Sequence, residues 1–123
     1  SKPELITNGN FDEGGEGWLQ APKVNFKAGT VNIGPAERPP YSGVGQAILE
    51  NEVTYDVVIE VVAIVGEGVF QVLDGANEAV YNITSTGTNS FFFTNSVGST
   101  FSIVNSSGES GDLVISNVSV KKQ

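Results

Sequence analysis

The acidic side chains that could act on a substrate are concentrated in one glycine-rich segment near the amino terminus. Asp12, Glu13 and Glu16 lie within the run 12–17, whose other three residues are glycines. Two carboxylates held at a fixed separation can hydrolyse a glycosidic bond, but a glycine-rich loop supports such a pair poorly. The chain also has no histidine and no cysteine, the residues on which most nucleophilic and acid–base catalysis depends. We therefore expect solvated loop charges and no enzymatic activity.

Net charge and hydrophobicity exclude two further classes of partner. Fourteen acidic residues against six basic ones give a net charge of -8, and such a field repels the phosphate backbone of nucleic acids. No apolar run approaches the roughly 20 residues that a membrane-spanning helix needs. The sequence therefore predicts neither a nucleic-acid partner nor a membrane partner.

The distribution of turn residues and β-branched residues predicts the fold class. Fifteen glycines and five prolines separate short runs rich in Val, Ile and Thr, as expected for strands joined by turns. In the longest run, 53–65, alternation places Tyr55 and every second residue up to Val65 toward the core. About ten such strands favour two packed antiparallel sheets. We expect an all-β sandwich that forms a single domain over residues 1–123.

Three segments, in order along the chain, resemble carbohydrate-binding modules of the galactose-binding-like jelly-roll type. They are the opening run from Leu5 to Asp12 that leads through Gly17 to Trp18, the middle pair 45–47 and 54–57, and the closing run from Leu113 to Val120. The resemblance implies a jelly-roll β-sandwich whose first and last strands lie side by side.

The same resemblance implies a structural calcium ion where the first loop meets the last strand. Calcium takes six to eight oxygen ligands from carboxylates, carbonyls and amides. Carried over by position, the candidate ligands are Asn10, Asp12, Glu13 and Asn117. Ser116 stands where the family usually has a ligating aspartate, which removes one charge from the site. No other cofactor is expected.

A glycan site would need exposed aromatic rings beside groups that hydrogen-bond sugar hydroxyls. Trp18 and Tyr55 match positions that are structural in the resembled modules. The remaining tyrosines predict a cleft lined by Tyr41, Gln71, Tyr81 and Asn82. Partial burial of each ring against a neighbouring strand or loop is the alternative.

The outward face of the run 53–65 is unusually apolar. Alternation places Val58, Val62 and Ile64 away from the core, which indicates a covered surface. Either the loop 36–41 of the same chain or a neighbouring molecule would cover it, so the sequence is compatible with a homo-oligomer.

Two functions remain open at this stage. The scarcity of sugar-stacking rings favours an accessory module of a larger assembly, such as a bacteriophage decoration or tail protein that binds neighbouring subunits at the virion surface. The alternative is an extracellular carbohydrate-binding module that recognises a glycan, either free or as part of a secreted glycoside hydrolase. Beyond the acids already discussed, nothing favours a hydrolase.

Overall fold

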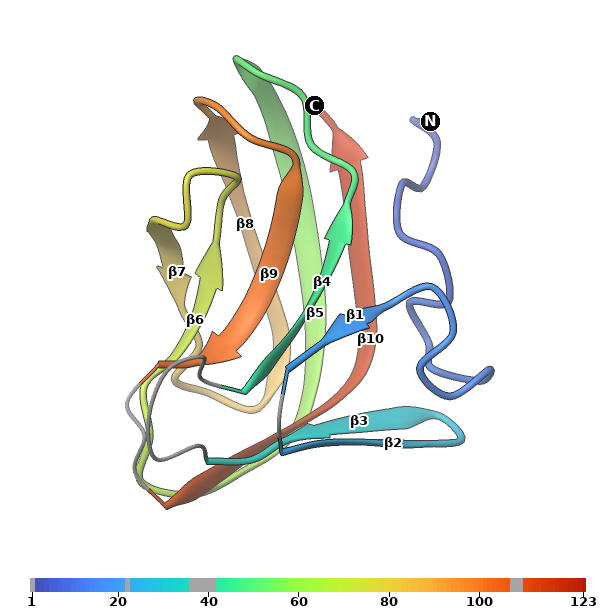
Figure 1. Cartoon of the computed structure of the whole chain (residues 1–123), viewed down its shortest axis with the longest axis vertical. Coiled ribbons are helices and arrows are strands. Elements are labelled where there is room, and N and C mark those ends of the chain that lie inside the picture. The colour runs from blue at the N-terminus through green and yellow to red at the C-terminus, as the bar shows by residue number, and fades with distance from the viewer. Residues whose placement is uncertain (1, 22, 36–41, 107–109) are drawn as a thin grey trace.

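Two antiparallel sheets of five strands pack face to face to form the molecule (Figure 1). The computed structural model describes residues 2–21, 23–35, 42–106 and 110–123. Sheet A has the strand order β1-β4-β9-β6-β7 and sheet B the order β2-β3-β10-β5-β8. The predicted all-β, two-sheet jelly-roll sandwich is confirmed. No helix in the described part of the chain is long and apolar enough to cross a membrane.

The strands of sheet A are β1 (Leu19–Gln20), β4 (Gly43–Ala47), β6 (Phe70–Leu73), β7 (Ala79–Asn82) and β9 (Thr100–Asn105). Those of sheet B are β2 (Val24–Lys27), β3 (Thr30–Ile33), β5 (Val53–Gly66), β8 (Gly87–Asn95) and β10 (Gly111–Lys122). Periodicity predicts strands that coincide with β2 to β10, at 24–27, 30–33, 44–50, 53–65, 69–73, 79–84, 90–94, 100–105 and 113–121. It also predicts a strand at 4–7, and it misses β1, which is too short to show an alternating pattern.

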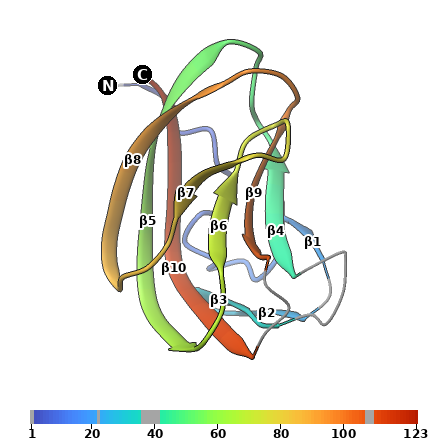
Figure 2. The same ribbon diagram turned by 90° about the vertical axis from the view of Figure 1, so that its left-hand side faces the viewer.

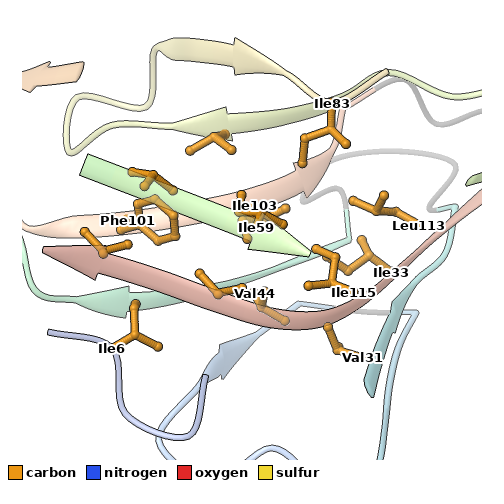
Figure 3. Packing of buried hydrophobic residues seen from close by; sticks show 14 of the residues in the cluster. Ile6, Val31, Ile33, Val44, Ile59, Ile83, Phe101, Ile103, Leu113 and Ile115 are labelled. Carbon is orange, nitrogen blue, oxygen red and sulfur yellow. The ribbon is translucent and has the colours of Figure 1, made fainter. Parts of the chain in front are cut away.

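The core lies between the sheets, and the inward-facing residues of both sheets supply most of it (Figure 3). Phe101 and Ile103 of sheet A face Ile59 and Ile115 of sheet B, and all four are fully buried. Alternate positions along each strand supply these residues, as the period of a half-buried strand requires.

The long strand β5 keeps the predicted alternation only as far as Val61. The pairing of β5 with β10 shifts register around Ile115, where Val62 has no partner on β10. One extra residue exchanges the faces of all positions beyond it. Ile64 therefore pairs with the buried Leu113 and packs against the core, whereas Val65 is 58% exposed. The predictions that Ile64 faces outward and Val65 inward are both wrong for this reason.

The amino-terminal segment lies beside the last strand, as the family resemblance implies (Figure 1). The Leu5 amide donates to the Val120 carbonyl and the Val118 amide donates to the Gly9 carbonyl, each at 2.9 Å. Residues 4–7 follow β10 in this way without forming the regular strand expected there.

Candidate functional site

The outer face of sheet A carries two rows of side chains that run across its strands. Cross-strand pairing defines the first row, which is Leu19, Gly45, Ser102 and Leu73. The second row is Gly43, Val104, Gln71 and Asn82. Their strand neighbours Val44, Ile103 and Val72 are buried in the core, so both rows face outward. The five strands give this face a width of about 19 Å, at about 4.8 Å per strand.

A groove of about 240 Å³ lies over the β1, β4 and β9 part of this face. Leu19, 60% exposed, forms one wall, and Thr100 and Val104 line the other. The floor is bare backbone at Gly43 and Gly45. A Cβ atom at position 43 would come within 2.7 Å of the Ile103 carbonyl oxygen, and one at position 45 within 2.9 Å of the Phe101 carbonyl oxygen. The close approach of β4 to β9 therefore requires glycine at both positions, which also keeps the groove open.

A fixed set of polar side chains continues the face beyond the groove. Gln71 donates from Nε2 to Oδ1 of Asn82 at 3.0 Å. Its Oε1 accepts a hydrogen bond from Ser106 Oγ, also at 3.0 Å. Both amide groups keep N–H donors that these bonds do not use. They are thus held in place by one another and can still bind a hydroxyl group.

The structure divides the four residues of the predicted sugar cleft. Gln71 and Asn82 lie together on the outer face of sheet A. Tyr81 is the cross-strand partner of the fully buried Val72 and therefore points to the opposite side. Its ring stacks on Phe91 with centroids 4.1 Å apart, and its hydroxyl donates to Asn89 Oδ1 at 2.7 Å. Tyr81 is thus a packing residue, which corrects the prediction. Tyr41 lies outside the described residues and remains a predicted contact.

The predicted calcium ligands are not gathered at one place. Asn10 and Asn117 line a hollow of about 230 Å³, but Asp12 and Glu13 are not among its lining residues. The side-chain oxygen of Asn10 accepts a hydrogen bond from the Asp12 amide. Within the described ranges, no three acidic or other metal-binding side chains come close enough together to hold an ion. The arrangement does not fit the implied site, and calcium binding stays an untested prediction.

The single carboxylate that lines this hollow, Glu4, is already occupied by hydrogen bonds. It accepts from the amides of Ile6 and Val120, at 3.0 and 2.8 Å, and from the Ser119 hydroxyl. Partial burial raises the pKa of Glu4, but these hydrogen bonds outweigh burial and hold the pKa below its ordinary value of 4.5. Glu4 therefore fastens the amino-terminal segment to β10 in its ionised form.

The opening run from Leu5 to Asp12, one of the three segments that carry the family resemblance, has a structural role through Asn8. Asn8 donates from its side chain to the carbonyls of Gly14 and Glu16, at 2.9 and 3.0 Å. Its side-chain oxygen accepts from the Glu13 amide and its backbone carbonyl from Trp18 Nε1. One asparagine thus folds the acidic loop 12–17 back on itself. The acids Asp12, Glu13 and Glu16 remain exposed, as expected for solvated charges.

On the outer face of sheet B, two of the three predicted interface residues lie as expected. Val58 is half-buried between neighbouring strands and Val62 is 55% exposed, whereas Ile64 faces the core. The loop 36–41, which we considered as a cover for this face, lies outside the described residues. Phe92 of β8 is more exposed than either valine, at 68%.

None of the residues that line the groove was among the predicted site residues. The alternation from Thr100 to Val104 does place Thr100, Ser102 and Val104 on one side of their strand. It does not show that this side adjoins Leu19 and two glycines of β4, because β4, β9 and β6 are neighbours in the sheet without being consecutive in the chain.

The fold is shared with several carbohydrate-binding modules. The second N-terminal cellulose-binding domain of β-1,4-glucanase C from Cellulomonas fimi aligns with a TM-score of 0.62 at 17% identity, covering 100% of this chain and 96% of that domain. A family 16 carbohydrate-binding module gives 0.58 at 20% identity, covering 94% of this chain and 98% of that one. The CBM35 module from Paenibacillus barcinonensis gives 0.61 at 14% identity, covering 100% and 99%. No protein-family model and no curated protein matches the sequence.

These similarities confirm the resemblance at the level of the fold. This chain has the jelly-roll architecture of carbohydrate-binding modules from several families. The three proteins named above are carbohydrate-binding modules, and none of them is a bacteriophage virion protein.

Proposed function

We propose that this protein is a non-catalytic carbohydrate-binding module that holds a glycan across the outer face of sheet A. The observation that carries the proposal is the glycine-floored groove that continues into the fixed amides of Gln71 and Asn82. Leu19 and Val104 offer apolar contact to the faces of sugar rings. The amides and Ser102 offer hydrogen bonds to hydroxyls, as expected of a site that is mostly apolar with a few placed polar groups. The similarity in fold to cellulose-binding and other carbohydrate-binding modules supports this proposal.

The shape and charge of this face narrow the class of glycan. It is wider than one sugar ring, so an oligosaccharide segment makes more contacts than a monosaccharide. Both rows consist of uncharged residues, and the chain as a whole carries a net charge of -8. A field of that sign repels uronic acids and sulfated sugars. The proposed ligand is therefore a neutral polysaccharide, and the proposed location is extracellular, where such polymers are found.

The test combines a glycan array with isothermal titration of the best ligand against matched variants. Gln71→Ala removes an amide and releases both of its neighbours, so we expect at least about a tenfold loss of affinity. The control is Gln123→Ala, which also removes a glutamine amide, but at a position just beyond the end of β10 in sheet B, where the Gln123 side chain donates to Asp56. Tyr41→Ala tests whether the remaining predicted ring contributes.

The proposal fails if no neutral glycan is retained by the wild-type chain. It also fails if Gln71→Ala and Gln123→Ala have the same effect on affinity, because binding would then lie away from sheet A. Retention of acidic glycans alone would contradict the assignment of the ligand class.

A further inference from the structure

The edge strand β8 leaves one side of sheet B open. Among the described residues it pairs with β5 alone, in an unbroken register of nine residues (Figure 2). The outward side of such a strand presents unpaired N–H and C=O groups, on which another strand can form. Natural edge strands usually avoid this with lysine, proline or a bulge. β8 contains none of the three.

The sequence of β8 is nearly the same in both directions. Read outward from Phe92, it has phenylalanine at 91 and 93, a hydroxyl residue at 90 and 94, and asparagine at 89 and 95. An antiparallel pair of identical strands centred on Phe92 places each residue opposite its counterpart in this list. The same surface then meets itself across a two-fold axis, as in most homodimers.

The side chains at this edge are only partly covered within one chain. Phe92, on the outer face, is 68% exposed. Phe91, on the inner face, is half-buried against Tyr81 of β7. A paired β8 would bring Phe92 beside Phe92 of the second copy, and directly opposite aromatic residues stabilise a sheet. It would also place Phe93 of the second copy beside Phe91.

Charge favours this edge over the rest of the surface for contact between copies. The segment from Ala79 to Gly108 contains no charged residue, although the whole chain has a net charge of -8. Two acids of β5 lie beside this edge: Asp56 is the cross-strand partner of Phe92, and Glu60 accepts a hydrogen bond from the Thr88 hydroxyl of β8 at 2.7 Å. Asp56 is the acid beside the centre of the proposed pairing. In the order β5-β8-β8-β5, the two Asp56 residues would lie three strands apart, at about 14 Å. This distance exceeds the screening length of about 8 Å at physiological ionic strength.

We propose that β8 is a homodimer interface, in which two copies pair antiparallel about Phe92 and join their B sheets into one. This interface leaves the outer face of sheet A free, and it does not depend on glycan binding. A dimer would carry two such faces and could bind a polymeric ligand at two points.

Cysteine crosslinking tests the register, because the natural chain has no cysteine. Residues directly opposite in adjacent strands have Cα atoms about 4.5–5.5 Å apart, which suits a disulfide. Phe92→Cys should therefore form a covalent dimer rapidly under mild oxidation. Ser90→Cys alone should not, because its own counterpart lies four residues along the strand, about 14 Å away. An equimolar mixture of Ser90→Cys and Thr94→Cys should crosslink as a heterodimer.

Sedimentation of the unmodified chain tests whether the dimer exists without a crosslink. We expect a monomer–dimer equilibrium that higher salt strengthens, since both copies are acidic. Phe92→Lys places like charges opposite each other and should raise the dimer dissociation constant at least about tenfold. The control Val62→Lys makes the same charge change at an exposed position of β5 and should leave the constant unchanged.

Three results would overturn the proposal. They are a monomer at every concentration and salt level, a dimer that Phe92→Lys and Val62→Lys affect equally, and crosslinking of Ser90→Cys as fast as Phe92→Cys. Growth beyond a dimer would also contradict it, because a closed two-fold interface stops at two copies.

Discussion

Tyr81 and Phe91 stack face to face across the open side of the sandwich, with ring centroids 4.1 Å apart and planes 5° from parallel. Tyr81 belongs to the last strand of sheet A and Phe91 to the last strand of sheet B. The pair joins the two sheets at their edge strands, beyond which the described part of the chain places no further strand over the core. This position explains why Tyr81, although it precedes Asn82 in the sequence, does not lie on the outer face of sheet A with Gln71 and Asn82.

The first prediction concerns this pair. Tyr81→Ala removes the stack and should lower the free energy of unfolding by about 3 kcal/mol. Tyr81→Phe keeps the ring but loses the hydrogen bond to Asn89, and should lower it by about 1 kcal/mol. Urea denaturation measures both values. Tyr81→Phe should leave glycan affinity unchanged, and a tenfold loss of affinity in this variant would instead place the tyrosine at the binding site.

The orientation of Tyr81 toward the core could have been predicted from the sequence. Alternation from Ala79 to Ile83 places Tyr81 on the same side of its strand as Ile83, a typical core residue that is 3% exposed. The same reasoning correctly predicts the inward residues of β5 as far as Val61. It fails beyond Val62 because the unpaired residue there forms a β-bulge, which depends on how β5 pairs with β10. The alternation within β5 alone does not reveal the register of that pairing.

The candidate site was less predictable than the fold for a related reason. Gln71 and Asn82 are neighbours through a short hairpin, so their proximity follows from local sequence. The contact of Leu19 with Gly45, and of Gly45 with Ser102, depends on the order β1-β4-β9. That order brings together residues far apart in the chain, and the local patterns of a single sequence do not reveal it.

The second prediction tests the wall of the groove. Leu19 is 60% exposed, so Leu19→Ala should change the free energy of unfolding by less than about 0.5 kcal/mol. It should nevertheless weaken glycan binding, because the apolar wall is lost. Val65→Ala truncates a residue of similar exposure, 58%, on sheet B. Titration of both variants with one glycan separates the two faces, and equal affinities would exclude Leu19 from the site.

The third prediction concerns the loop that Asn8 organises. Asn8→Ala removes three side-chain hydrogen bonds and places alanine at a φ of 54°. Both effects destabilise the fold, together by about 2–4 kcal/mol. Asn10→Ala loses one exposed hydrogen bond, to the Asp12 amide, and should cost about 1 kcal/mol or less. Thermal or urea unfolding compares the two, and similar losses would show that Asn8 is not the centre of the loop.

The fourth prediction concerns calcium. The hollow that Asn10 and Asn117 line contains a single carboxylate, that of Glu4, whose oxygens are already hydrogen-bonded. We therefore expect the melting temperature to be the same with millimolar calcium and with EDTA. A clear rise with calcium, lost in Asn117→Ala, would establish the site that the family resemblance implies.

The fifth prediction follows from the lowered pKa of Glu4. A carboxyl group whose pKa is lower in the folded chain stabilises the fold while it is ionised, so its contribution is complete above the unfolded pKa, near 4.5. This contribution disappears as the pH falls through the lower, folded value. The amides of Ile6 and Val120 and the hydroxyl of Ser119 then lose a charged acceptor.

Glu4→Gln removes this charge at every pH and keeps the shape of the side chain. Urea denaturation at pH 6 should therefore find the wild-type chain more stable than Glu4→Gln, and the difference should shrink as the pH is lowered toward 3. Glu52→Gln removes an exposed carboxylate outside this network and serves as the control for the change in net charge. If the difference in the free energy of unfolding between the wild-type chain and Glu4→Gln stays constant with pH, the ionised carboxylate does not hold the amino-terminal segment on β10.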